Sequence, residues 1–405
     1  MTTSTDAGSF DRRLLLGAAG LAALAANRAV GGPLTPPAGA VTPSGKTLLE
    51  TEPRTAINAV NTPGDATSVY RITTPGSYYL TSNIVAPAVK SGIKVSVGGV
   101  TIDLCGFEVL GLGITGGADG TINGVNVTSS VTGVRIFNGT VRNWSGPGVR
   151  LGLSGLLEDV RFVSCGLSTF QPAVDLAGKC VMQNCTVSGG AYTGIDASAS
   201  CVLRACSVSD AGEFGISAAS ACTLEGCSVS SSGGTGILAD EGSMLIGCTS
   251  SFNGENGFRL TAATAHGCAA QNNNTGAGFS MNGPSMAKGC YSHRNQVGFS
   301  YFNGAVLIDN TATNNSQYGF SGGTSGFSSR LEGNTARSNP TGFYLQAAGN
   351  FFARNTAALS STNNWNIAAG NFCLVIDAVG SAAAIVGNSG GASPGSTNPN
   401  ANYSL

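Results

Sequence analysis

Hydrophobic and polar residues alternate over very short stretches along most of the chain. In one representative repeat, apolar residues occupy every second position of GISAA (215–219), CTLEG (222–226) and CSVSS (227–231). This period of two is typical of β-strands with one face toward a core, and the repeats lack the spacing of an amphipathic helix. The pattern therefore predicts three short strands in each repeat, joined by tight turns.

The same pattern returns about every 21 residues, and three kinds of residue mark it. Cysteines recur in two series, namely Cys165, Cys185, Cys206, Cys227, Cys248, Cys268 and Cys290, and Cys180, Cys201 and Cys222. A glycine followed by an apolar residue keeps the same interval at Gly194-Ile195, Gly215-Ile216, Gly236-Ile237, Gly257-Phe258, Gly278-Phe279, Gly298-Phe299, Gly319-Phe320 and Gly342-Phe343. Asparagines form the third series, five residues after a cysteine of the first series or after its replacements Asn310 and Asn334: Asn253, Asn273, Asn295, Asn315 and Asn339.

Three columns with one period indicate that the chain coils into a solenoid. Each coil would stack on the preceding one at about 4.8 Å, the spacing of neighbouring strands. Roughly 14 coils would then make a rod of about 65–70 Å. Asparagine tolerates left-handed backbone and bonds its own main chain, so the asparagine column predicts a tight turn that is repeated in every coil.

The spacing of the cysteines also decides how we interpret them. Residues 21 positions apart in a solenoid are stacked neighbours, so the series marks one recurring interior site. Cysteine alternates with Val and Leu in CVLRACSV (201–208), as a small buried hydrophobic residue does. Asparagine replaces it at 310 and 334, which an obligate disulfide would not tolerate, and the spacing does not match zinc ligand pairs. We therefore predict buried free thiols rather than disulfides or a metal site.

The N-terminus has the features of an export signal. Arg12 and Arg13 precede the apolar run 14–26, which is too short to span a bilayer well. The paired arginines favour a twin-arginine signal, which exports folded proteins; an ordinary secretory signal is the alternative. We predict an export signal at 1–26, a Pro/Gly-rich flexible tether at 27–50, the repeat domain at 51–385 and a loop-like tail at 386–405.

Composition narrows the range of partners. The net charge is −1 and only 10% of the residues are charged, which gives no electrostatic footprint for nucleic acid. No segment after the signal is apolar enough to be a membrane anchor, so we expect no membrane insertion of the mature chain. We expect the exported protein in the periplasm, at the cell surface or outside the cell.

The repeats resemble those of right-handed parallel β-helices of the pectin lyase superfamily. The resemblance rests on the recurring Gly-Ile motif, the recurring Cys/Asn-x-Val motif and the asparagine ladder. The segments RITTPGSYYLTSNIV (71–85), GVTIDLCGFEVLG (99–111) and FNGTVRNWSGPGVRL (137–151), and the ending NPNANYSL, are similar to exported bacterial β-helix repeat proteins of largely unassigned activity. The resemblance implies an all-β fold, a single-stranded right-handed parallel β-helix with about 21 residues per coil. It covers residues 50–405 and implies a fold more than a function, because this superfamily includes lyases, hydrolases, esterases, epimerases and non-enzymes.

A search for catalytic motifs leaves one candidate column. None of the hydrolase motifs N-T-D, D-D, G-H-G and R-x-K of polygalacturonase-like enzymes occurs here, and His266 and His293 lie outside such contexts, so turn or partly exposed histidines are expected. The residue after each Gly-apolar pair should point outward by strand alternation. This places Arg150, Asp175 and Asp196 in three consecutive coils, provided that an insertion lies around 164–171. A salt-bridged surface column is the plainer interpretation.

We expect these three residues to be the catalytic candidates, and Arg259 and Tyr344 of the same column to bind substrate. The partner would be a polysaccharide or cell-envelope glycan, bound along the outer strand face and, if the protein is an enzyme, acted on as by a polysaccharide lyase or glycoside hydrolase. We predict no organic cofactor, and calcium is a candidate ligand of the carboxylates. The alternative is a non-catalytic structural or adhesive surface protein, favoured by the low charge and the missing motifs.

Overall fold

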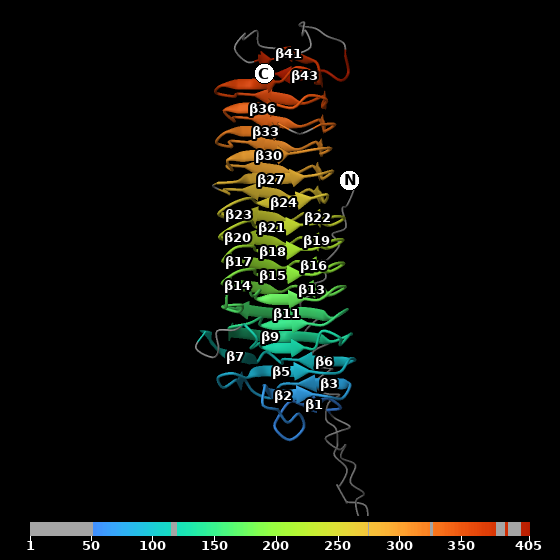
Figure 1. The fold of residues 1–405 in the computed structure, drawn as a ribbon, viewed down its shortest axis with the longest axis vertical. Helices are drawn as coiled ribbons and strands as arrows, with labels where there is room; N and C mark the ends of the chain where they lie inside the picture. Colours follow the sequence, from blue (N-terminus) through green and yellow to red (C-terminus); the bar gives the residue numbers. More distant parts are fainter. Residues whose placement is uncertain (1–51, 115–119, 274, 325–326, 378–384, 388–397) are drawn as a thin grey trace, which may run out of the picture. The chain divides into compact units, whose positions relative to one another are not determined.

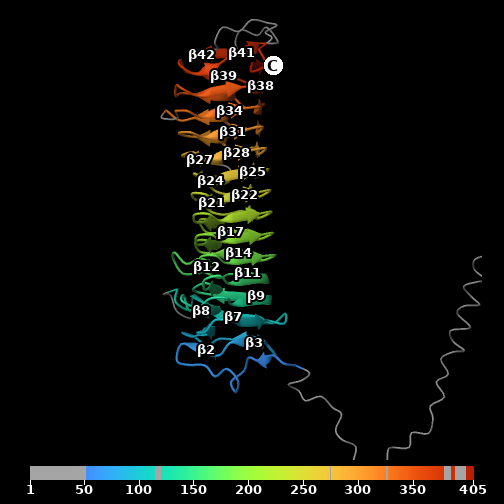
Figure 2. The same cartoon turned by 90° about the vertical axis from the view of Figure 1, so that its right-hand side faces the viewer.

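The computed structural model describes residues 52–114, 120–273, 275–324, 327–377, 385–387 and 398–405. Residues 52–405 form one compact unit in which coils of β-strand stack in sequence order along one axis (Figure 1). The pairings between the named strands of the described residues are parallel, and the strands stack coil upon coil, as the view turned by 90° also shows (Figure 2); one isolated antiparallel bridge joins Pro63 to Tyr70. The prediction of an all-β, right-handed parallel β-helix with about 21 residues per coil is confirmed.

One strand of each coil contributes to a sheet of 15 strands, which we call sheet B. It consists of β2 (Ser68–Ile72), β5 (Ser91–Val95), β8 (Val125–Val127), β10 (Val149–Leu151), β12 (Val174–Leu176), β15 (Ile195–Ala197), β18 (Ile216–Ala218), β21 (Ile237–Ala239), β24 (Phe258–Thr261), β27 (Ala277–Asn282), β30 (Val297–Tyr301), β33 (Tyr318–Gly322), β36 (Thr341–Leu345), β39 (Asn363–Ile367) and β42 (Ile385–Gly387).

The other strands lie in two rows. The rows belong to one 28-stranded sheet, sheet A, because β9 and β11 are long enough to pair with strands of both rows. The first row consists of β1 (Thr55–Ala56), β3 (Gly76–Tyr79), β6 (Val100–Asp103), β9 (Arg135–Trp144), β11 (Leu156–Val163), β13 (Val181–Gln183), β16 (Val202–Arg204), β19 (Thr223–Glu225), β22 (Met244–Ile246), β25 (Thr264–His266), β28 (Met286–Lys288), β31 (Val306–Ile308), β34 (Arg330–Glu332), β37 (Phe351–Ala353) and β40 (Phe372–Cys373). The second row adds β4 (Ile84–Val85), β7 (Glu108–Gly113), β14 (Thr186–Gly190), β17 (Ser207–Ala211), β20 (Ser228–Ser230), β23 (Thr249–Ser251), β26 (Ala269–Gln271), β29 (Tyr291–His293), β32 (Thr311–Thr313), β35 (Thr335–Arg337), β38 (Thr356–Ala358), β41 (Val375–Asp377) and β43 (Asn402–Ser404).

The core consists of columns of identical or similar side chains. All twelve cysteines are free thiols, and the ten in the two predicted series are buried. The apolar residue of the Gly-apolar pair lies directly inside sheet B, where the rings of Phe258, Phe279, Phe299, Phe320, Phe343 and Trp365 stack at centroid distances of 4.2–4.9 Å. Strand spacing sets this ring spacing, since one ring is added per coil.

The asparagine column has a different role from the predicted one. Asn295 and its equivalents are buried, and the left-handed residue of each turn is the one before, such as Arg294 at φ 52°. The ladder asparagines from Asn253 to Asn315 each bond the next coil; for example, the backbone N–H of Asn295 donates to Oδ1 of Asn315 at 3.0 Å. The amide column therefore joins coils together, and the turn itself is made by its neighbour.

The structure tests the prediction for the C-terminal end of the chain but not the one for the N-terminal end. Residues 402–404, expected in a loop-like tail, form β43, which lies between β38 and β41 and pairs with both. Arg12 and Arg13 lie outside the described residues. None of the described residues forms a helix that is long and apolar enough to cross a membrane.

Candidate functional site

The outer face of sheet B carries a single column of side chains, one from the middle of each strand. In strands such as β15, the flanking Ile195 and Ala197 are fully buried while Asp196 between them is exposed. Pairing of the strands fixes the order of this outward column from the N-terminal end: Arg71, Lys94, Asn126, Arg150, Asp175, Asp196, Ser217, Leu238, Arg259, Ser280, Ser300, Ser321, Tyr344 and Asn366. The column therefore changes from cationic to acidic to largely uncharged along the axis.

Arg150, Asp175 and Asp196 lie side by side in three consecutive coils. Nε of Arg150 donates to Oδ2 of Asp175 at 2.8 Å, and both side chains are partly exposed. Desolvation of the Asp196 carboxyl by its neighbours is the largest cause that raises its pKa, and the negative charge of Asp175 is the second. A hydrogen bond with Ser217 opposes this rise. The site thus combines one carboxylate that is neutralised by a guanidinium with one that holds its proton more tightly than usual.

Three aromatic side chains border the acidic part of the column; Phe170 is exposed, and Tyr192 and Phe214 are half-buried. Phe170, in the loop 164–173 before β12, packs edge-on against Tyr192 at 5.2 Å, and Tyr192 against Phe214 at 5.9 Å. The Tyr192 hydroxyl bonds the carboxylate of Glu213, and desolvation together with the charges of Glu213 and Asp196 raises the pKa of Tyr192. These rings occupy the edge where each coil enters sheet B, directly beside Asp175 and Asp196.

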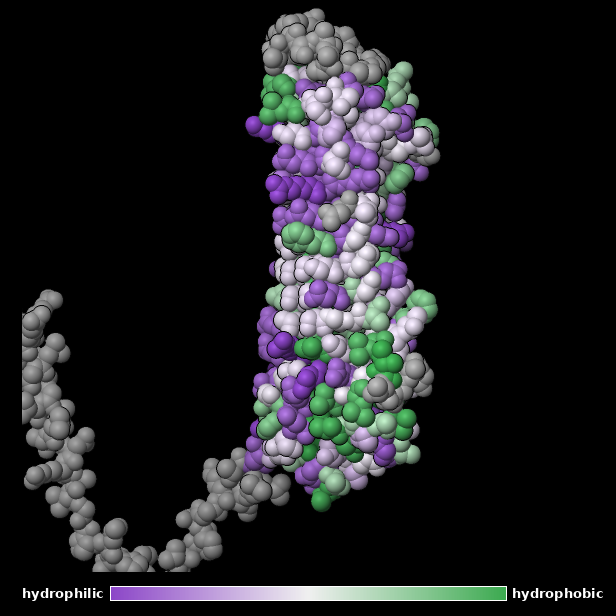
Figure 3. All heavy atoms as spheres, turned by 90° about the vertical axis from the view of Figure 1, so that its left-hand side faces the viewer, coloured by the Kyte–Doolittle hydropathy of each residue, from purple (hydrophilic) through white to green (hydrophobic). Residues whose placement is uncertain are grey.

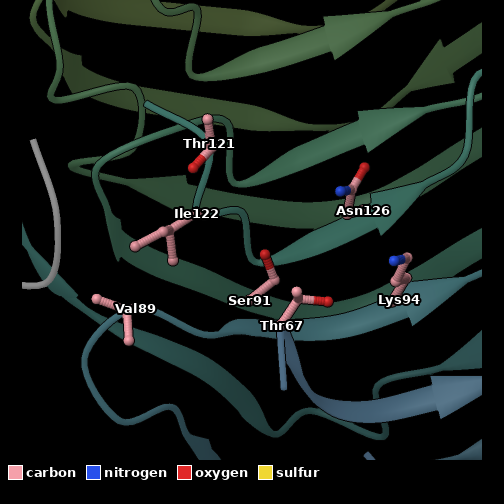
Figure 4. A pocket seen from close by; sticks show the side chains of 7 residues that line it. All are labelled: Thr67, Val89, Ser91, Lys94, Thr121, Ile122 and Asn126. Atoms are coloured by element: carbon pink, nitrogen blue, oxygen red, sulfur yellow. The ribbon is translucent and has the colours of Figure 1, made fainter. Parts of the chain in front are cut away.

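A pocket lies further along the same edge, next to the cationic part of the column (Figure 4). Its volume is about 250 Å³, and its lining combines hydroxyls, an amine, an amide and two aliphatic side chains: Thr67, Val89, Ser91, Lys94, Thr121, Ile122 and Asn126. Lys94 and Asn126 belong to the outward column, and Asn126 pairs in register with Arg150. The pocket and the ion pair therefore lie in neighbouring coils of the same column.

The two predicted substrate-binding residues lie on this face but apart from the acidic pair. Arg259 is three coils beyond Asp196, or about 14 Å by strand spacing, and Tyr344 is seven coils beyond it, or about 34 Å. Tyr344 stacks on Tyr318 at 4.4 Å with ring planes 13° apart. Only a ligand that extends along the axis would reach all of these side chains.

The sequence analysis missed the residues that border the column. Phe170, Tyr192 and Phe214 recur every 22 residues, but they precede their strands by different numbers of residues, so they fall outside the three columns that mark the repeat. Lys94 and Asn126 belong to coils of irregular length, in which the cysteine and asparagine columns are absent. An aromatic residue shortly before successive Gly-Ile pairs, in AYTGI (191–195) and GEFGI (212–216), is the signal that could have found two of them.

The column offers hydrogen-bond acceptors and a guanidinium but few ligands for a metal ion. Calcium needs six to eight oxygen ligands, whereas Asp175 and Asp196 supply only two carboxylates, one of them bonded to Arg150. Within the described part of the chain, no group of three or more His, Cys, Asp or Glu residues could hold a metal ion. Carboxylates accept hydrogen bonds from hydroxyls, a guanidinium pairs with anionic groups, and exposed rings pack against the C–H faces of sugars.

Residues 216–358 match the family model described as right handed beta helix region. No curated protein matches the sequence. Among solved structures, the chain is similar to the Dettilon tailspike protein (13% identity, TM-score 0.45, 79% of this chain and 60% of that chain). It is also similar to the A-module of a mannuronan C-5 epimerase from Azotobacter vinelandii (14% identity, TM-score 0.38, 68% of this chain and 90% of that chain). A third similar structure is the tailspike of E. coli bacteriophage HK620 in complex with a hexasaccharide (10% identity, TM-score 0.42, 82% of this chain and 70% of that chain). The chain is a right-handed parallel β-helix protein.

Proposed function

We propose that this protein is exported and binds an extended polysaccharide or cell-envelope glycan along the outer face of sheet B. One observation carries the proposal: an arginine–aspartate pair and a second aspartate share one column, with partly exposed aromatic rings on one side and a pocket at one end. Sugars present both hydroxyl edges and apolar C–H faces, and this surface offers partners to both.

The linear order of the site favours a polymer over a small molecule. The pocket at Lys94, the ion pair at Arg150 and the carboxylate of Asp196 lie in successive coils, so they extend over about 19 Å along the axis. Arg259 and the stacked pair Tyr318–Tyr344 lie further along the same face and would bind more distant sugars. A small ligand would leave most of these side chains unused.

Binding is tested with the processed, exported protein on an array of neutral and anionic polysaccharides, followed by calorimetry on the glycans retained. We expect Asp175→Asn together with Asp196→Asn to weaken binding about tenfold, because charged hydrogen-bond acceptors are lost from the site. Ser300→Ala, on the same face, is the matched control. The melting temperature should change little, since these side chains lie at the surface. Unchanged affinity in the double variant would leave the column as a salt-bridged surface.

Turnover is tested separately on the glycans that bind. Reducing-end release indicates hydrolysis, and a new unsaturated product absorbing in the ultraviolet indicates elimination. Asp196→Asn should abolish either activity if the Asp196 carboxyl transfers a proton, because the amide has no exchangeable acid. If no glycan on the array binds, the structural or adhesive role becomes the better account of this surface.

Export depends on the N-terminal segment in this proposal. Replacing Arg12 and Arg13 by lysine should retain the folded precursor in the cytoplasm if the twin-arginine route is used. Fractionation of cells that express the wild type and the double variant measures this. Equal export of both proteins would point to the ordinary secretory route.

A further inference from the structure

A second side-chain cluster lies where the β29 and β32 coils turn toward sheet B. In the coils from β20 to β38 the residue directly after the second strand of sheet A has left-handed backbone, so these residues lie in register at the edge. This left-handed turn column consists of Ser231, Phe252, Asn272, Arg294, Asn314, Ser338 and Leu359. The buried asparagine ladder that follows it, Asn295 to Asn315 to Asn339, fixes the turns by bonds between coils.

Three polar side chains form a network at this place. Nδ1 of His293 lies 3.0 Å from Oγ1 of Thr313, and the Tyr291 hydroxyl lies 3.0 Å from the same atom. The rings of Tyr291 and His293 lie nearly parallel, with centroids 5.8 Å apart. His293 is therefore held on the strand surface, by two neighbours, beside the turn that carries Arg294.

The turn beside this network is hollowed. A depression of about 200 Å³ is lined by Arg294, Asn295, Asn314 and Ser316. The Asn295 amide is occupied by the ladder, while Arg294, Asn314 and Ser316 are exposed. A guanidinium, an amide and a hydroxyl therefore converge on one small hollow, and all three can donate hydrogen bonds.

This edge carries two arginines, Arg294 and Arg337, for which no ion pair is found among the described residues. Arg337 pairs in register with Thr313, which pairs with His293, so its backbone lies about 10 Å from that of His293. Among the described residues, neither Arg294 nor Arg337 forms an ion pair, whereas Arg204, Arg330 and Arg354 each have a glutamate partner. Figure 3 shows this side of the molecule, with hydrophobic side chains gathered over the N-terminal coils and hydrophilic ones over the C-terminal coils. The hollow thus differs in character from the aromatic edge near Asp196.

We propose that Arg294, Asn314, Ser316 and Arg337 form a binding site for a tetrahedral oxyanion, a phosphate or sulfate group. Arginine donates two parallel bonds to such a group, and the amide and hydroxyl can bond its remaining oxygens. Arg337, two coils from His293, has a side chain long enough to approach from the other side. The site is independent of the proposed glycan site, because Asp196 lies on another strand face five coils away.

Isothermal titration of the full processed protein at low ionic strength tests the site, with inorganic phosphate, inorganic sulfate and glucose 1-phosphate as probes. We expect wild type to bind phosphate and Arg294→Gln with Arg337→Gln to bind at least about tenfold more weakly. Added chloride salt should weaken wild-type binding, since the attraction is electrostatic. Arg204→Gln, which removes an equally exposed arginine that already has a partner, should bind like wild type.

The comparison of probes identifies the source of the anion. Tighter binding of glucose 1-phosphate than of inorganic phosphate would assign the site to a phosphorylated saccharide, and equal affinities would assign it to the free anion. Asp196→Asn should bind phosphate like wild type, so failure of the glycan proposal leaves this one intact. Equal phosphate binding by wild type and the double arginine variant, or no phosphate binding by wild type, would overturn the proposal.

Discussion

One interior column of the β-helix is built from thiols in one region and from amides in the next. Cys206, Cys227 and Cys248 lie in consecutive coils, and Asn310, Asn334 and Asn355 occupy the equivalent position further along. In both regions the backbone N–H of one coil points at the side chain of the next coil. The Cys206 N–H points at the Cys227 sulfur, and the Asn310 N–H donates to Oδ1 of Asn334 at 3.0 Å. The geometry is the same and the acceptor differs.

The difference in acceptor changes what the column contributes. Sulfur is a weak acceptor and the thiol a weak donor, as in the contact from Sγ of Cys227 to the Leu203 carbonyl at 3.6 Å. The amide of Asn334 donates at 2.9 Å both to Oδ1 of Asn355 and to the Leu307 carbonyl. The thiol coils therefore depend on packing, and the amide coils add a chain of buried hydrogen bonds that support one another.

The residues of sheet B that face this column also change along the axis, and this change comes earlier, at Phe258, where the column residue is still Cys248. Sheet B contributes Ile195, Ile216 and Ile237 to the interior of the thiol coils, and stacked aromatic rings from Phe258 onward. Glycine precedes the inward residue in coils of both kinds, as at Gly215 before Ile216 and Gly298 before Phe299. A Cβ at Gly298 would lie 2.3 Å from the Gly319 carbonyl oxygen and 3.0 Å from Nδ2 of Asn315. Glycine here permits the ladder amide to approach the backbone closely.

Alkali should separate the two regions most strongly. Burial raises the pKa of Cys165 and of Cys185 to about 12, against an ordinary value near 9. The folded state therefore holds these protons more tightly, so their contribution to stability is complete below about pH 9 and is lost as the pH rises toward 12. Each such thiol removes about 1.4 kcal/mol of stability per pH unit in this window. We expect the thiol coils to unfold above pH 9 before the amide coils do.

Thiol alkylation at increasing pH, with mass spectrometry of the labelled peptides, measures this opening. Cysteines of the two series should resist iodoacetamide at pH 8 and become reactive together as the coils open. Peptides from the thiol coils should then be cut by a protease that is active at high pH, while those from 310–358 remain protected. Simultaneous loss of protection in both regions would show that the regions are equally sensitive to alkali.

The interior columns are the part of the molecule that the sequence predicts best, and the physical reason is their period. Strand stacking forces equivalent residues to recur at one interval, so Cys227 or Phe299 could be placed in the core, and Arg150, Asp175 and Asp196 in one column, without coordinates. Side chains at the edges of coils have no such constraint, because loops vary in length. The pocket at Lys94 was missed for this reason.

The role of the turn asparagines shows a second limit of sequence reasoning. Asparagine favours both left-handed turns and buried amide ladders, and its identity alone does not distinguish them. At Asn314 and Asn315 the two roles are adjacent: the first has φ 54° and is exposed, and the second is buried and bonds the next coil. Only the alternation of inward and outward side chains assigns each residue to its role.

A buried ladder amide should be costly to remove. Asn334→Ala leaves the backbone N–H and side-chain amide of Asn310 without their acceptor and the Leu307 carbonyl without its donor. Each buried group left without a partner costs about 1–3 kcal/mol, so we expect a loss of about 3–5 kcal/mol in the free energy of unfolding. Urea denaturation with linear extrapolation measures this loss. Asn366→Ala, on the outer face of sheet B, is the matched control and should change stability by less than about 0.5 kcal/mol.

The smallest effect expected is that of the equivalent change in the thiol region. Cys227→Ala removes one sulfur atom, a small volume, and a weak hydrogen bond to the Leu203 carbonyl. We expect a loss of about 1 kcal/mol, below the ~2–5 kcal/mol of a large aliphatic truncation, and the same for Cys206→Ala. Because both cysteines are free thiols, a reducing agent should leave the melting temperature of the wild type unchanged. A loss for Cys227→Ala as large as that for Asn334→Ala would contradict the distinction between a packed column and a hydrogen-bonded one, since the two positions differ mainly in the acceptor that they present to the coil before them.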